Sequence, residues 1–457
     1  MSLLQIAWRN FCHRSLSSIL TTISLALGVG LVVLVLSVFG VINEAFTRNS
    51  YVGYNLVVGP KGSPLQLTLN SVFYLSQPIE NLPYTEYMEF FDQQQRAAMV
   101  AQYGGDPALG QRDGKYAAFV AGGFAIPLAL GDYFGEFRVV GTTPEFFEKL
   151  RYGADLDQPF TFAQGRAMKT YSPQHGYFEA VLGSRVAKEM NVSVGDTFNP
   201  THGDPGGAGH DEGFVVVGVM DPTGTPNDRA ALVNLEGFYL MDGHAKPIED
   251  EEAEFVPPSE SLSGDPSDQL SLPSIPEREV TSILVRNGNI MFAPAMQNMI
   301  NEGIRAQAAA PVGEINKLMN LIVGPLMRAL LAITLITCFV AAVGILVAIY
   351  NSMNDRRRDI AVMRALGARR DTVTAIIIVE SLLVAVIGGA VGWVLAHAAI
   401  ALYSGQIEDQ TGVSVGFFST SGYELYILPV VLALALFAAL LPAWSAYRTD
   451  VGSNLSA

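Results

Sequence analysis

A glycine-rich stretch in the middle of the chain carries the side chains best suited to bind a metal ion. His202 and His210 lie in it, Asp211 and Glu212 follow directly, and His244 comes later, near a run of acidic residues. Imidazoles and carboxylates are ordinary ligands of zinc and other divalent ions. The spacing, however, matches no established ligand pattern. We therefore expect a solvated loop that binds no metal, with His202, His210, Asp211 and Glu212 as the candidate ligands if an ion does bind.

A short charged stretch, residues 354–370, has the chemistry of a docking segment. It contains six arginines between two long apolar segments, which places it on the cytoplasmic side if those segments span a membrane. Apolar side chains recur at helical spacing on one face, whereas charged side chains point elsewhere. The apolar positions are Ile360, Met363, Leu366 and Gly367, and the charged ones are Arg357, Asp359 and Arg364. We predict a short amphipathic helix that ends at Gly367. A basic topology anchor also explains the arginines, but it needs no apolar face.

No part of the sequence matches a nucleotide-binding or hydrolytic motif. The Gly-x-x-x-x-Gly-Lys-Ser/Thr pattern is absent, and the nearest imitation, residues 59–63, lacks its spacing. Neither a nucleophile elbow nor a His-Glu-x-x-His helix occurs. We therefore expect no catalytic residues, no enzyme activity and no cofactor bound by this chain. Any ATP hydrolysis must come from a partner that binds ATP and Mg²⁺.

One apolar segment near the C-terminus contains residues suited to helix packing or coupling. Glu380 lies close to its cytoplasmic end, where a buried carboxylate is costly unless it is paired. It either pairs with an arginine near residues 354–370 or extends to the membrane interface. Gly388 and Gly392 form a small-xxx-small pair, which permits close contact between helices. We expect such a pair to serve packing inside one chain, and contact with a second copy is the alternative.

The segments that must position these residues account for the composition. Hydrophobic residues make up 50% of the 457 residues and charged ones only 16%, which indicates a membrane protein with a large soluble part. Four segments are long enough to cross a bilayer, at 19–42, 319–353, 373–403 and 425–448. Both termini then lie in the cytoplasm, in agreement with the basic residues beside each span. The connecting parts are an amphipathic interfacial helix at 1–18, a cytoplasmic helix at 354–372, an outer loop at 404–424 and a cytoplasmic tail at 449–457.

Residues 43–318 are predicted to form a large α+β domain outside the cytoplasm. The net charge is −15 although the residues beside the spans are basic, so the acidity resides in this domain and argues against a nucleic-acid surface. Short apolar runs bounded by Gly, Pro or polar residues predict strands, and apolar residues at helical spacing predict helices. The strands are expected at 55–58, 137–140, 214–220 and 282–285, and the helices at 144–150, 184–190 and 295–309.

Two segments of this domain have a more specific pattern. Residues 65–75 alternate between apolar and polar side chains, which predicts a half-buried strand; contact with an apolar substrate leaving the bilayer is a second use for this segment. Residues 246–279 are rich in proline, serine and acids and have little to bury. We interpret them as a flexible insertion.

The charged stretch resembles the FtsX-like permease domain of ABC transporters of the MacB and LolC type, the type VII superfamily. In that family basic residues, an acidic residue and a small apolar run precede Arg/Lys-Ala-Leu/Ile-Gly-Ala. Here Arg358, Asp359 and Ile360 begin the pattern, and residues 363–368 complete it. Where the family usually has Glu and Gly, this chain has Asp359 and Ala361. Short motifs between residues 141 and 219 resemble the MacB periplasmic domain, so the resemblance extends over most of the chain.

The resemblance implies a multi-pass permease subunit without a fused ATPase, in the bacterial inner (cytoplasmic) membrane, with its large domain in the periplasm or outside. Residues 354–372 would be the coupling helix, which docks on a separate ABC ATPase subunit. The residues carried over to that role are Arg358, Asp359, Ile360, Met363, Arg364, Leu366 and Gly367. A second permease copy, as a homodimer, is implied. Membrane lipids and a periplasmic protein or lipoprotein are further partners, and nucleic acid is not.

The resemblance also implies a mechanotransmission mechanism. ATP-driven closure of the ATPases would move the coupling helices, and the outer domains would respond by extracting or exporting a lipoprotein, peptide or amphipathic small molecule. One alternative is an FtsX-like regulator that acts on a periplasmic hydrolase or sensor without transport. A metal-linked transport system is the other.

Overall fold

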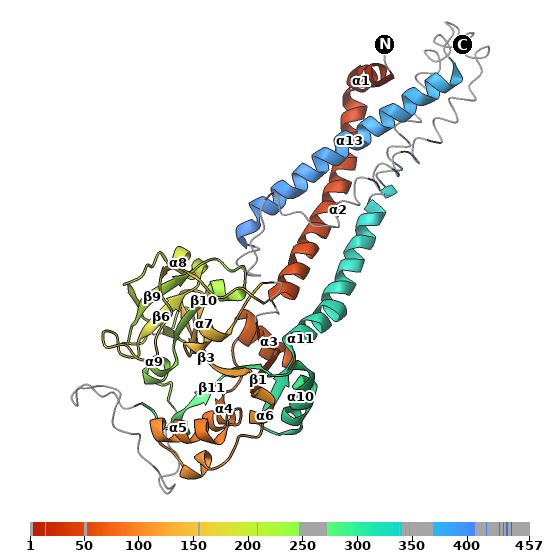
Figure 1. Ribbon diagram of the computed structural model, residues 1–457. Helices are drawn as coiled ribbons and strands as arrows, with labels where there is room; N and C mark the ends of the chain where they lie inside the picture. The colour runs from red at the N-terminus through yellow and green to blue at the C-terminus, as the bar shows by residue number, and fades with distance from the viewer. Residues whose placement is uncertain are drawn as a thin grey trace. The chain divides into compact units, whose positions relative to one another are not determined.

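The computed structural model describes residues 3–13, 15–49, 53–153, 156–207, 209–245, 272–337 and 369–406, with a few single positions between 339 and 440 (Figure 1). The chain divides into two compact units. One, the apolar unit, comprises Met1–Ala45 with Met319–Ala457, and the other, the sheet unit, comprises Phe46–Leu318. Residues 354–368 of the predicted cytoplasmic helix and most of the predicted fourth span, 425–448, lie outside the described residues.

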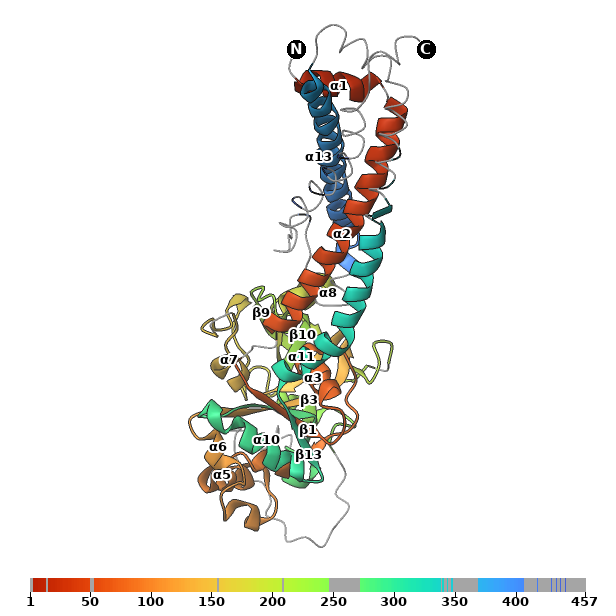
Figure 2. The same ribbon diagram turned by 90° about the vertical axis from the view of Figure 1, so that its right-hand side faces the viewer.

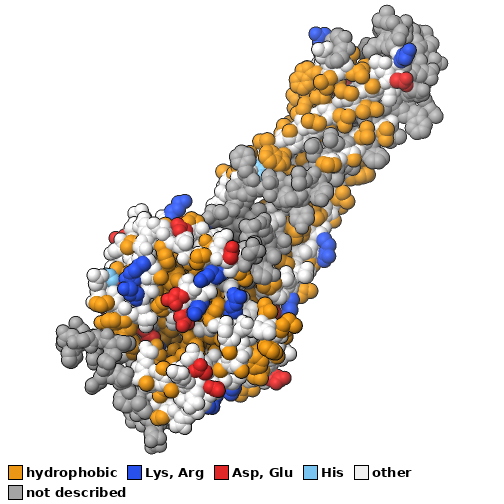
Figure 3. Space-filling view, in the orientation of Figure 1, with side chains coloured by type: hydrophobic (Ala, Val, Ile, Leu, Met, Phe, Trp, Pro, Cys, Tyr) orange, Lys and Arg blue, Asp and Glu red, His pale blue; other side chains and the backbone are white. Residues whose placement is uncertain are grey.

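Long apolar helices dominate the apolar unit. They include α2 (Ser15–Asn49) and α13 (Arg370–Leu402), and the short α1 (Leu3–His13) precedes them. In the described part of the chain, three helical segments are long and apolar enough to cross a membrane: Ser18–Gly40, Pro311–Thr337 and Asp371–Leu402. Their outward faces are apolar, as Figure 3 shows, and on α2 the exposed side chains include Leu20, Ile23 and Leu27. Such faces suit contact with lipid tails.

Small residues bring α2 and α13 into close contact (Figure 2). A Cβ atom added at Gly392 would lie 2.5 Å from the carbonyl oxygen of Ala26, and one added at Gly388 would lie 3.0 Å from the Leu25 side chain. By contrast, a Cβ at Gly389 meets nothing within 4 Å. The small-xxx-small pair therefore packs against a helix of the same chain.

One mixed sheet runs through the sheet unit and has 11 strands. Its main path follows β13 (Ala306–Ala309), β1 (Leu56–Pro60), β12 (Ser282–Arg286), β3 (Phe124–Phe134), β4 (Phe137–Thr142), β10 (Ala230–Asn234), β6 (Glu179–Leu182), β9 (Phe214–Met220) and β5 (Phe162–Gly165). Two short strands join it from the side: β7 (Thr197–Phe198) pairs with β9, and β8 (Thr201–His202) pairs with β3. A separate two-stranded sheet joins β2 (Leu82–Pro83) to β11 (Glu279–Val280). The pairs β4–β10 and β6–β9 are parallel and the other pairs are antiparallel, so the sheet is mixed, in a unit for which the sequence predicted an α+β fold.

Two hydrophobic cores lie along this sheet, and strand β3 contributes residues to both. The first core lies between β1, β12 and β13 and the helices α4 (Tyr84–Met88), α5 (Gln93–Tyr103) and α10 (Ala293–Glu302). The second lies between β4, β6, β9 and β10 and the helices α8 (Ser184–Met190) and α9 (Leu235–Leu240). The remaining helices are α3 (Pro64–Phe73), η1 (Pro107–Gly110), α6 (Ala117–Val120), α7 (Glu145–Lys149), η2 (Pro226–Arg229), η3 (Ile275–Glu277), η4 (Ile290–Phe292), α11 (Pro311–Leu318) and the π-helical turn η5 (Met319–Val323).

Two predicted elements of this unit were wrong for identifiable reasons. The predicted strand 65–75 is instead helical as far as Phe73, the end of α3, because the Ser63 side chain accepts a hydrogen bond from the Gln66 N–H and Pro64 occupies the first turn. The predicted helix 295–309 ends at Glu302, because Gly303 terminates α10 and Ala306–Ala309 pairs with β1 as a strand. The other predicted strands and helices of the unit are confirmed.

The predicted flexible insertion, 246–279, has an ordered C-terminal end. Residues 246–271 lie outside the described part, but Ile275 and Arg278 are buried in the first core. Arg278 forms an ion pair with Glu236 of α9, with Nη2–Oε2 and Nη1–Oε1 distances of 2.5 and 3.2 Å. Its guanidinium carbon lies 3.6 Å from the ring centre of Tyr103, whose hydroxyl donates to Glu236. Burial alone would lower the pKa of Arg278, but the Glu236 carboxylate raises it on balance.

Candidate functional site

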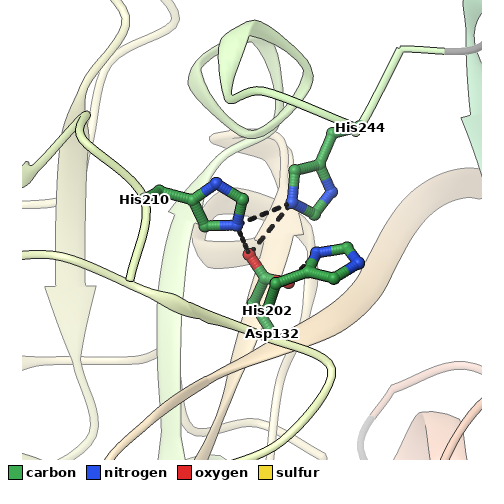
Figure 4. Close-up of side chains that lie close together, drawn as sticks. All are labelled: Asp132, His202, His210 and His244. Atoms are coloured by element: carbon green, nitrogen blue, oxygen red, sulfur yellow. Dashed lines mark hydrogen bonds and ion pairs between the residues drawn. The ribbon is translucent and has the colours of Figure 1, made fainter. Parts of the chain in front are cut away.

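Four side chains of the sheet unit, Asp132, His202, His210 and His244, converge on one point (Figure 4). Their potential ligand atoms all lie within 4.8 Å of one another. Three of the six histidines in the sequence therefore gather around one carboxylate.

The carboxylate of Asp132 comes from strand β3. The pairing of β3 with β4 shifts between Leu130 and Tyr133, so Asp132 sits at an irregularity that redirects side chains. At the same place β3 pairs with β8, where Asp132 and His202 are directly opposed. Opposed residues of an antiparallel pair point to the same face, and this pairing brings the His202 ring to Asp132.

His210 reaches the site because the glycine-rich loop folds back on the residues before it. The His210 N–H donates to the Pro200 carbonyl at 2.9 Å, and the Asn199 side-chain amide donates to the His210 carbonyl at 2.8 Å. The return needs small residues, since a Cβ at Gly207 would lie 2.5 Å from the His202 carbonyl oxygen. Hydrogen bonds to both the N–H and the carbonyl of His210 thus fix the loop at this position.

His244 comes from the turn after α9. Asn234 begins this helix by accepting a hydrogen bond from the Glu236 N–H, and Gly243, with φ of 84°, turns the chain after it. The His244 ring then lies 4.4 Å from the ring of Phe238, centre to centre. This contact fixes the direction in which its Nε2 atom points.

The distances at the centre are short and similar. Oδ2 of Asp132 lies 3.1 Å from Nε2 of His210 and 3.1 Å from Nε2 of His244, and the two nitrogens are 3.2 Å apart. Nδ1 of His202 lies 3.3 Å from the other carboxylate oxygen. The Asp132 side chain is fully buried, His210 and His244 are 7% exposed, and His202 is 60% exposed. Three of the four side chains of the site are therefore buried or nearly so, and the fourth, His202, is exposed to solvent.

The structure brings together only part of the set considered from the sequence. His202 and His210 are in the cluster, whereas Asp211 and Glu212 are not among its four residues. The histidines also differ from the solvated loop that we expected, since two of them are nearly buried against a carboxylate. Sequence reasoning missed Asp132 altogether. Its one signal is an acid in an otherwise apolar strand pattern, Phe124–Phe134.

The residues assigned to ATPase coupling cannot be placed in the same way. Arg358, Asp359, Ile360, Met363, Arg364, Leu366 and Gly367 lie outside the described residues. Glu380 lies in α13 and is partly buried there.

Comparison with known families gives the chain its class. The profile of the MacB-like periplasmic core domain matches residues 18–254, and that of the FtsX-like permease C-terminal region matches residues 331–451. The chain belongs to the FtsX- and MacB-like ABC transporter permeases. The four residues of the cluster lie within the span matched by the MacB-like domain.

Individual relatives match over shorter stretches. The macrolide export ATP-binding/permease proteins MacB of Brucella abortus and Brucella melitensis are each 32% identical over 145 residues, which is 32% of this chain and 20% of theirs. An uncharacterized ABC transporter permease of Methanocaldococcus jannaschii is 34% identical over 82 residues, 18% of this chain and 21% of its own. The alignments thus span about a fifth of the length of these relatives.

Proposed function

We propose that this permease couples ATP hydrolysis by a separate ABC ATPase to movements of its periplasmic domain, in the manner called mechanotransmission. Two permease copies and two ATPases would form the working assembly in a bacterial inner membrane. The cargo would be a lipoprotein, a peptide or an amphipathic small molecule. Two of the relatives are named for macrolide export, which supports the last of these classes.

The observation that carries the proposal is the pairing of β1 with β13. Strand β1 follows α2 in the sequence, and β13 is followed by α11 and the apolar segment Pro311–Thr337. The two strands are antiparallel, with Val57 opposite Ala309 and Pro60 opposite Ala306. The start of β1 therefore lies beside the end of β13, and both connections to apolar helices leave the sheet at the same end. Under this proposal, a displacement of the preceding or following helix would be passed along the chain to this strand pair.

The ATPase would dock on the apolar face of residues 354–372. A charged side chain placed on that face would lose its hydration on docking without gaining a counter-ion, at a cost of several kcal/mol. We expect Met363→Glu with Leu366→Glu to abolish copurification of an ABC ATPase and to leave membrane insertion unchanged. Copurified ATPase would be identified by mass spectrometry and measured by its ATP hydrolysis.

The matched control places a change of charge on the other face of the same segment. Arg357→Gln should reduce ATPase binding far less than the double variant does. If the double variant retained the ATPase as wild type does, this face would not be the docking surface, and the proposed coupling would fail.

A further inference from the structure

We propose that Asp132, His202, His210 and His244 form a binding site for one divalent transition-metal ion, with zinc as the preferred ion. The inference concerns the sheet unit alone, and it goes beyond the proposed transport function. It is drawn from the burial of the carboxylate, the mutual distances of the ligand atoms and the chemistry of the ligand set.

The buried carboxylate has no hydrogen-bond donor of acceptable geometry in the described part of the chain. Asp132 is fully buried, and neither of its oxygens receives a hydrogen bond of acceptable geometry there. Arg138 of the neighbouring strand interacts with Asp132 electrostatically, but it donates no hydrogen bond to it: its Nη2 donates to the Ser76 carbonyl, and its guanidinium lies 4.2 Å from the ring centre of Tyr133. A buried carboxylate without hydrogen-bond donors is unfavourable, and a cation bound beside it would stabilise it.

No placement of protons on His210 and His244 turns all of the close contacts with Asp132 into good hydrogen bonds. Nε2 of His210 and Nε2 of His244 both face the same carboxylate oxygen and also face each other at 3.2 Å. If both nitrogens carried protons, two donors would be in contact. If only one did, its single hydrogen would have to serve both the other nitrogen and the carboxylate. Lone pairs of Asp132 Oδ2, His210 Nε2 and His244 Nε2 that converge on one point are instead the arrangement that binds a metal ion.

The distances agree with tetrahedral coordination. Zinc lies about 2.0–2.2 Å from nitrogen and oxygen ligands, so the ligand atoms of a tetrahedral site are separated by about 3.3–3.6 Å. Here Oδ2 of Asp132 and the two Nε2 atoms form a triangle with sides of 3.1, 3.1 and 3.2 Å. This triangle is one face of a slightly compressed tetrahedron. Nδ1 of His202, on the exposed side, lies within 4.8 Å of these atoms and would be the fourth ligand.

The ligand types select the class of ion. Three imidazoles and one carboxylate favour zinc and its neighbours in the transition series, whereas Ca²⁺ and Mg²⁺ prefer oxygen ligands. An ion bound here would connect strand β3, the glycine-rich loop and the turn after α9, which are far apart in the sequence. Its binding should therefore stabilise the folded sheet unit.

The test uses the purified full-length chain in detergent after treatment with a chelator. Zn²⁺ would be titrated by calorimetry, and Co²⁺ would be followed by the visible absorption typical of tetrahedral coordination. We expect one ion per chain, with the Co²⁺ signal displaced by Zn²⁺. Loss of an outer-shell partner lowers metal affinity about 10–100-fold, so Asp132→Asn and His210→Ala, which remove direct ligands, should lower it by at least about 100-fold.

Two further variants keep the test decisive. His202→Ala removes the exposed ligand, which contributes little to packing, so its loss of affinity would not reflect misfolding. His175→Ala changes a partly buried histidine of the same unit outside the cluster and should bind Zn²⁺ as wild type does. A zinc-dependent rise in Tm in wild type and His175→Ala, but not in His202→Ala, supports the site. Absence of binding at micromolar Zn²⁺, or equal affinity in Asp132→Asn and wild type, would overturn it.

Discussion

Replacing Glu236 with glutamine should destabilise the sheet unit strongly, because it leaves a buried guanidinium without its counter-ion. Arg278 is fully buried and its Nη1 and Nη2 atoms both donate to the Glu236 carboxylate. Glutamine offers one oxygen and turns an NH₂ group toward the arginine, so one donor faces another. Removing one partner of a buried ion pair typically costs about 3–5 kcal/mol. That is a large fraction of the ~5–15 kcal/mol that stabilises a folded domain.

The assay is thermal unfolding of the full-length chain in detergent, followed by circular dichroism. For a unit of this size, about 1 kcal/mol corresponds to a shift of ~2–4 °C, so Tm should fall by about 6–20 °C. Amide hydrogen exchange would localise the loss to α9 and α5, since Glu236 lies in α9 and Tyr103, at the end of α5, donates to it.

A surface ion pair provides the matched control. Glu189 pairs with Arg185 one helical turn away on α8 and is 43% exposed. Glu189→Gln should cost no more than about 0.5 kcal/mol. Replacing both Glu236 and Arg278 by leucine and methionine should destabilise less than Glu236→Gln does, because no charge is left unpaired. Equal Tm values for Glu236→Gln and Glu189→Gln would refute the argument from burial.

Three further predictions follow from single contacts. Gly392→Val should disrupt the packing of α2 on α13 and lower Tm in detergent, whereas Gly389→Val, with open space around it, should not; equal effects would contradict the close approach. Burial raises the pKa of the Glu179 carboxyl, but hydrogen bonds from the Arg166 side chain and the Lys169 N–H lower it by more. The net result is a pKa below the usual range. This stabilisation is present above the unfolded-state pKa of about 4.3 and is lost as the pH falls through the lower folded-state pKa, so Tm should drop as the pH falls below about 4.3, and less steeply in Glu179→Gln. Ser63→Ala should cost about 0.5–2 kcal/mol in urea unfolding through loss of the α3 cap, and no change would show that Pro64 suffices.

Short-range patterns in the sequence predicted the elements whose causes are local. Apolar runs bounded by glycine or polar residues predicted β4, β9 and β12, since a strand buried on both faces needs such a run. Residues 65–75 were mistaken because strict alternation over so short a length does not distinguish a strand from a helix with a good cap. There the serine and proline at 63 and 64 were the better signal.

The cluster of Asp132 with three histidines could be predicted only in part, because its geometry comes from long-range pairing. His202 and His210 are close in the sequence and were recognised as potential ligands. Asp132 joins them only through the pairing of β8 with β3, and His244 only through the end of α9. Nothing in local periodicity reports such a pairing. The family, in contrast, could be recognised from the sequence because its coupling-helix motif is contiguous.

Strand β3 has a mechanical consequence for how the periplasmic domain responds to force. It pairs with β12 at five positions through its first half and with β4 at four positions through its second half. Opening a gap between the two cores would break this ladder, at about 0.5–1.5 kcal/mol for each backbone hydrogen bond. The parts of the sheet unit on either side of β3 are therefore expected to move as one rigid body. A displacement of β13, the strand that precedes α11, would therefore be passed across the sheet to β5 at the opposite edge.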